Sequence, residues 1–149
     1  MPAQKNLLLQ RIINLAEGVK QSSGQRTIPV HVYRGAMLQR LQRPGLNFCE
    51  RPLLVVRSSN GRMSTEYTPD FIILDESIDA AVVCLIASSQ TRPIDVDRAQ
   101  ACLDAYRENA FGLLINFGGE KLLWSLITQN QRRFYPQRKP CLAGLDLPP

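Results

Sequence analysis

An acidic residue stands at the start of an apolar strand near the middle of the chain. Asp70 follows Pro69 and precedes the run Phe-Ile-Ile-Leu at 71–74. A carboxylate is a hard oxygen ligand of the kind that Mg²⁺ prefers, so Asp70 is the first candidate for a metal-binding or catalytic side chain. A single carboxylate binds Mg²⁺ weakly, and a working site would need further acids brought close by folding.

Several other acids lie near Asp70 in the sequence and are candidates to converge on it. Each also has an ordinary structural interpretation, because acids favour turns and the first turn of a helix, where they meet the positive end of the helix dipole. The sequence alone leaves both interpretations open. The acids concerned are Glu66, Asp75, Glu76, Asp79, Asp95 and Asp97.

A second group of candidate functional residues is basic and lies near the C-terminus. The whole chain has a formal net charge of +5 and a pI near 9.3, which suits an acidic partner. Basic side chains can bind phosphates and an aromatic ring among them can stack on a base, but a solvated charged end is the alternative. The candidate nucleic-acid-binding residues are Arg132, Arg133, Tyr135, Arg138 and Lys139.

The cysteine pattern argues against a zinc site. The four cysteines form no CxxC pair, and His31 is the single histidine in the sequence, whereas structural zinc sites use closely spaced pairs of such ligands. Cys84 lies within the apolar run 80–87, so we expect it to be a small core residue.

Composition predicts one globular domain. The chain has 149 residues, of which 44% are hydrophobic and 21% charged, within the range of soluble proteins. No apolar run approaches the roughly 18 residues of a membrane span, and the N-terminus lacks the pattern of a secretory signal. We therefore expect a cytoplasmic protein with no membrane partner.

Apolar periodicity predicts a mixture of helices and strands. The run 80–87 is apolar on both faces, which is typical of a central strand covered on both sides, and Asn60-Gly61 favours a tight hairpin turn. The expected domain covers residues 1–130 and is followed by a basic, proline-rich tail at 131–149. The expected elements are helices at 4–21 and 29–42, strands at 52–57, 65–74 and 80–87, a helix from Pro93, and a strand at 112–117. The segment 121–127 has both helical and strand character, and we favour a short strand.

This order resembles the α/β restriction-endonuclease-like core, a three-layer fold in which helices flank a mixed central sheet of four to five strands. The run Gly-Leu-Leu-Ile-Asn-Phe-Gly at 112–118 resembles a strand of the GxxExxY family, a bacterial branch of the PD-(D/E)XK nuclease superfamily. The resemblance covers roughly residues 5–127. It places Asp70 at the family's metal-binding aspartate and Tyr33 at the tyrosine of its helix motif.

Four other positions depart from the family's pattern. Cys84 stands at the strand glutamate and Ile86 at the lysine. Val30 stands at the helix glutamate and Thr27 at the glycine of the same helix motif. In a strand, residues two apart point to the same face, so Cys84 and Ile86 keep the geometry of the motif without its charges. Hydrolysis at a Mg²⁺ site needs hard ligands and a charge that stabilises the transition state or orients water, which these side chains do not supply.

The departures predict a catalytically inactive nuclease-like protein that serves as a binding or assembly module, with Cys84 and Ile86 in the core. No cofactor is expected under this hypothesis. The partner would be another protein or a second copy of the chain, with nucleic acid as a further candidate through the basic tail. The alternative is a metal-dependent nuclease that acts on DNA or RNA through a rearranged site and requires Mg²⁺.

Overall fold

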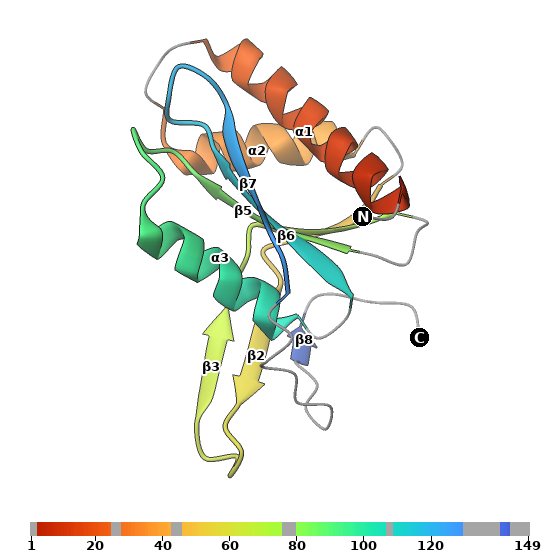
Figure 1. The fold of residues 1–149 in the computed structure, drawn as a ribbon, viewed down its shortest axis with the longest axis vertical. Coiled ribbons are helices and arrows are strands. Elements are labelled where there is room, and N and C mark those ends of the chain that lie inside the picture. Colours follow the sequence, from red (N-terminus) through yellow and green to blue (C-terminus); the bar gives the residue numbers. More distant parts are fainter. Residues whose placement is uncertain are drawn as a thin grey trace.

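Three helices cover the two faces of a central sheet in the computed structural model, which describes residues 3–24, 28–42, 46–75, 80–106, 109–129 and 141–143 (Figure 1). Helices α1 (Ala3–Ser23) and α2 (Val30–Leu41) lie on one face, and α3 (Pro93–Ala105) lies on the other. The fold is therefore the three-layer α/β arrangement predicted from the sequence. No described helix is both long enough and apolar enough to cross a membrane.

The central sheet has five strands in the order β1-β4-β5-β6-β7. Strands β5 and β6 are parallel and are joined through α3, while the other neighbouring pairs are antiparallel, so the sheet is mixed as expected. The short β7 confirms the strand that the sequence predicted near 121–127. The bounds are β1 Asn47–Glu50, β4 Phe71–Leu74, β5 Ala80–Ile86, β6 Ala110–Asn116 and β7 Leu123–Ile127.

A second, three-stranded sheet has the order β3-β2-β8, from β2 (Leu53–Arg57), β3 (Ser64–Tyr67) and β8 (Cys141–Ala143). The predicted hairpin is confirmed, because β2 and β3 pair antiparallel across a turn in which Gly61 has a φ of 73°. The prediction of one strand over 65–74 was wrong. Pro69 has no N–H for a sheet ladder, and the chain changes sheets there, so β3 and β4 are separate strands.

Alternation along the strands divides the core between the two faces of the sheet. Odd-numbered residues such as Val83 and Leu113 pack against α1 and α2, and even-numbered residues such as Val82 and Leu114 pack toward α3. Because side chains alternate along a strand, the central strands need apolar residues on both faces, and they have them at every position except Asn116, the last residue of β6. Cys84 therefore faces α3.

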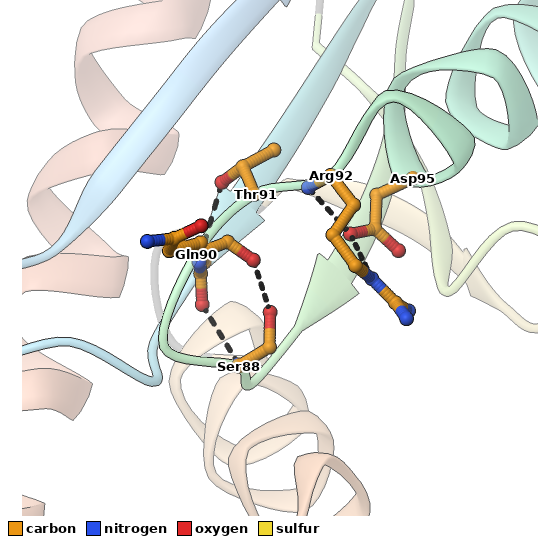
Figure 2. Close-up of polar contacts among 6 residues, drawn as sticks. Ser88, Gln90, Thr91, Arg92 and Asp95 are labelled. Carbon is orange, nitrogen blue, oxygen red and sulfur yellow. Dashed lines mark hydrogen bonds and ion pairs between the residues drawn. The ribbon is translucent and has the colours of Figure 1, made fainter.

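The connection between β5 and α3 is fixed to the end of β6 by a buried amide. Asn116 is 1% exposed, and its Oδ1 accepts hydrogen bonds from the backbone N–H of Ser88 at 3.1 Å and of Gly118 at 2.8 Å. Its Nδ2 donates to Thr91 Oγ1 at 3.2 Å. Figure 2 shows this connection from Ser88 to Arg92. The carboxyl ends of the two parallel strands are thereby held together beside the start of α3.

Candidate active site

Asp70 lies immediately before β4, where β4 begins to pair with β5. Its backbone N–H donates to the carbonyl of Val83 at 2.9 Å, and its carbonyl accepts from the N–H of Arg51 at 2.9 Å. The side chain, which is 13% exposed, turns back toward β5, and its Oδ2 accepts a hydrogen bond from the N–H of Leu85 at 2.7 Å. The carboxylate thus satisfies a backbone donor of β5 that lies beyond the start of β4.

The second carboxylate oxygen of Asp70 is bound by an arginine from α2. Arg34 Nε donates to Asp70 Oδ1 at 2.6 Å, and the Arg34 side chain is 18% exposed. Hydrogen bonds between ionised groups are roughly twice as strong as neutral ones. A metal ion approaching Asp70 would therefore have to displace a guanidinium that already neutralises the carboxylate.

A cavity of about 220 Å³ opens beside Asp70. The four positions to which the sequence drew attention line this one cavity: Val30 from α2, Asp70, and Cys84 and Ile86 from β5. Their convergence follows from the fold, because the end of β5 and the start of α2 meet beside the start of β4. The cavity is the candidate site of the molecule.

Cys84 is buried as expected, with 7% of its surface exposed. Cys84 of β5 and Cys102 of α3 both line the cavity. A hydrogen bond with the Cys102 thiol, reinforced by burial, raises the pKa of Cys84 well above its ordinary value. The same hydrogen bond lowers the pKa of Cys102. Cys84 is therefore a neutral thiol at pH 7, which is a poor ligand for a hard cation.

Ile86 corrects the prediction that it would be a core residue. It is half-buried and lines the cavity. Ile86 is only half-buried because of the register of the sheet. Strand β4 pairs with β5 only as far as Val83, so the last residues of β5 have no β4 residue beside them. The Ile86 side chain still borders the cavity, but it is uncharged.

Asp95 is the acid that folding brings to the same cavity as Asp70. It is 5% exposed and lies in the first turn of α3, where its Oδ2 accepts from the N–H of Arg92 at 2.9 Å and from Arg92 Nε at 3.5 Å (Figure 2). The backbone hydrogen bond lowers the pKa of Asp95. Of the other acids considered, Glu66, Asp75 and Asp97 do not line the cavity, and Glu76 and Asp79 lie outside the described residues.

Asp95→Asn is expected to lower the free energy of unfolding by about 1 kcal/mol at pH 7, because the charged cap of α3 is lost. The pKa of Asp95 is depressed in the folded state, so its stabilisation is present above the ordinary pKa of 3.8. That stabilisation disappears as the pH falls through the folded-state value. Urea unfolding at pH 7 and at pH 2 checks this. An unfolding difference of equal size at both pH values would contradict it.

Three arginines at the cavity were not predicted from the sequence: Arg34, Arg51 and Arg98. Arg34 could have been found, because residues four apart share one face of a helix and Arg34 follows Val30 by four. Arg51 and Arg98 carried no such signal, since their places depend on how the second sheet and α3 meet the first sheet. The predicted tail residues Arg132, Arg133, Tyr135, Arg138 and Lys139 lie outside the described residues.

A comparison with protein families identifies the fold to which this geometry belongs. A family model described as the PD-(D/E)XK nuclease superfamily matches residues 6–125, which run from α1 into β7 and include the whole cavity wall. The chain belongs to the PD-(D/E)XK nuclease superfamily. Comparisons with curated proteins and with solved structures give no significant match.

The metal on which nucleases of this superfamily depend does not fit the side chains at this cavity. Both carboxylate oxygens of Asp70 are already bonded, Cys84 is a neutral thiol, and Asp95 is bonded to Arg92. Within the described part of the chain, no group of three or more His, Cys, Asp or Glu side chains is arranged to hold a metal ion. The donor set is thus unlike the oxygen-rich set that Mg²⁺ requires.

Proposed function

We propose that the chain is a GxxExxY-type member of the superfamily whose active site has degenerated, and that it serves as a binding or assembly module. The observation that carries the proposal is the engagement of Asp70. Arg34 at 2.6 Å and the N–H of Leu85 at 2.7 Å bond its two oxygens. The acid that would anchor a metal instead holds α2 to the start of β4 and to β5.

Chemical reasoning supports the same conclusion. Hydrolysis of a phosphodiester by this route requires a cation beside the phosphate and a group that activates water. The cation next to Asp70 is the guanidinium of Arg34, which cannot lower the pKa of a coordinated water. Val30, Cys84 and Ile86 also avoid the cost of burying polar groups without partners, which is the pattern expected where catalysis no longer constrains a cavity.

An exposed apolar edge supports a protein partner or a second copy of this chain. Among the described strands, β7 is an edge of the five-stranded sheet, and it exposes 52% of Leu123, 43% of Trp124 and 36% of Leu126. Unpaired strand edges with apolar side chains are sites for association. We also propose that residues 132–139 bind nucleic acid and that the protein is cytoplasmic.

A second candidate function is a metal-dependent nuclease that acts on DNA or RNA through a rearranged site. The observation that favours it is the presence of Asp95 in the same cavity as Asp70. For both acids to hold Mg²⁺, Asp70 would have to release Arg34, and Asp95 would have to give up the N–H of Arg92.

Metal titration distinguishes the two functions. We expect Mg²⁺ or Mn²⁺ to change the melting temperature by less than about 1 °C, because a ligand stabilises a protein only by binding its native state. A metal at a hundred times its Kd would add about 2.7 kcal/mol, or roughly 5–10 °C for a domain of this size. A rise of that size that Asp70→Asn and Asp95→Asn each abolish would establish the nuclease alternative.

A further inference from the structure

We propose that the cavity beside Asp70 binds a phosphate monoester through Arg51, Arg98 and Thr68. This inference rests on the proposed binding role and deepens it by naming the class of ligand. The three side chains belong to segments that are distant in sequence and line the same cavity of about 220 Å³. A binding site on this chain would therefore be formed only in the folded domain.

The residues that line the cavity carry a surplus of positive charge. Three arginines and two aspartates line it. Asp70 is neutralised by Arg34, and Asp95 is bonded to the N–H and side chain of Arg92. Among the described residues, Arg51 forms no ion pair with a carboxylate, so its guanidinium is available to an anion. The charge of Arg98 acts on Asp95 and helps to lower the pKa of that carboxyl, and it adds to the positive charge beside the cavity.

The backbone of Arg51 is the second observation. Arg51 has a φ of 51° and is the one residue other than glycine with a positive φ among those described. Residues with a Cβ avoid this conformation, and where they adopt it they cluster at functional sites. The bond from the Arg51 N–H to the Asp70 carbonyl at 2.9 Å fixes the strained residue beside the candidate acid, and Arg51 is one of the residues that line the cavity. Glycine would adopt this positive φ more easily than arginine. What arginine provides at position 51, and glycine would not, is a guanidinium group.

Size and chemistry limit the ligand. A volume of 220 Å³ corresponds to about seven water molecules, which admits a phosphoryl group with a few further atoms but is smaller than the usual pocket of a drug-sized ligand. Guanidinium forks match the oxygens of phosphate and can bind them in pairs. Thr68, exposed at the cavity, adds a hydroxyl donor, and Val30, Ile86 and Leu114 provide an apolar wall for a small carbon group.

The test is a binding titration of the full chain with inorganic phosphate and with glycerol phosphate, at constant ionic strength and in the presence of EDTA. We expect both to bind and to raise the melting temperature, and dimethyl phosphate, a diester, to bind at least tenfold more weakly. Arg51→Gly should weaken phosphate binding at least tenfold without lowering the melting temperature, since glycine relieves the positive φ. Arg62→Ala removes an exposed arginine outside the cavity and should leave binding unchanged.

Two further arms identify the source of the phosphate. Short oligonucleotides with a 5′-phosphate are compared with the same strands ending in a hydroxyl. Binding of the phosphorylated strands alone would support the monoester chemistry and assign it to a polymer end. Three results would each overturn the inference. They are equal binding of both strands, an equal loss of phosphate affinity in Arg51→Gly and Arg62→Ala, and no binding of phosphate by the folded chain. Because EDTA excludes metal, failure here leaves the proposed inactivity intact, whereas stabilisation by metal would overturn the proposed function instead.

Discussion

Gly118→Ala is expected to lower the free energy of unfolding by about 3 kcal/mol or more, which is a large effect for one methyl group. A Cβ at this position would lie 2.2 Å from the nitrogen, 2.4 Å from the oxygen and 2.6 Å from the carbonyl carbon of Ser88. These are backbone atoms in the connection just after β5, and the bond between the Ser88 N–H and Asn116 fixes them. The strand ends therefore cannot separate without breaking the network that positions α3.

The neighbouring glycine is the control for this prediction. A Cβ at Gly119 would meet nothing closer than the carbonyl oxygen of Lys121 at 3.5 Å, which is ordinary van der Waals contact. Gly119→Ala should therefore change stability by no more than about 0.5 kcal/mol. Urea unfolding of the two variants checks the pair, and equal stabilities would show that the close approach of Gly118 to Ser88 is wrong.

Asp70→Ala is expected to destabilise the protein by about 2–4 kcal/mol, because it leaves a largely buried guanidinium without its partner. Arg34 is only 18% exposed, and the N–H of Leu85 would lose its acceptor as well. Asp70→Asn retains an acceptor oxygen and should cost less. Asp97→Ala, which removes an exposed acid of α3, controls for the change in net charge and should cost no more than about 0.5 kcal/mol.

A double-mutant cycle separates the ion pair from other effects of removing Asp70. In an Arg34→Met background, no guanidinium loses its partner when Asp70 is removed. Asp70→Ala should therefore lower the free energy of unfolding by at least about 1 kcal/mol less than it does in the wild type. Denaturant unfolding of the four proteins gives the coupling energy. Additive costs would mean that the contact between Arg34 and Asp70 does not stabilise the fold.

The sequence was sufficient for the elements whose apolar pattern is complete. The runs that became β5 and β6 are apolar on both faces and flank a helix that starts at Pro93, which predicts parallel neighbours at the centre of a sheet. The strand β1 was missed because its four residues, Asn-Phe-Cys-Glu, are too few to show alternation. The second sheet was missed because its third strand, β8, comes from a segment near the C-terminus that the sequence assigned to a tail.

The candidate site could be predicted only in part, for a similar reason. The resemblance to the family's motif identified Asp70, Cys84 and Ile86, and they meet because residues two apart on a strand share a face and β4 pairs with β5. The half-buried state of Ile86 depended on where β4 begins, which spacing does not show. The arginines were missed because pairing of Arg34 with Asp70, the positive φ of Arg51 and the approach of Arg98 are all consequences of tertiary packing.

Cleavage of nucleic acid is the most direct test of the claim that this nuclease-fold chain is catalytically inactive. Labelled single- and double-stranded DNA and RNA would be incubated with the full chain and Mg²⁺ or Mn²⁺, and the wild type compared with Asp70→Asn at a temperature where both are folded. We expect the wild type to cleave no more than Asp70→Asn or than a reaction containing EDTA. Metal-dependent cleavage by the wild type that Asp70→Asn abolishes would contradict it.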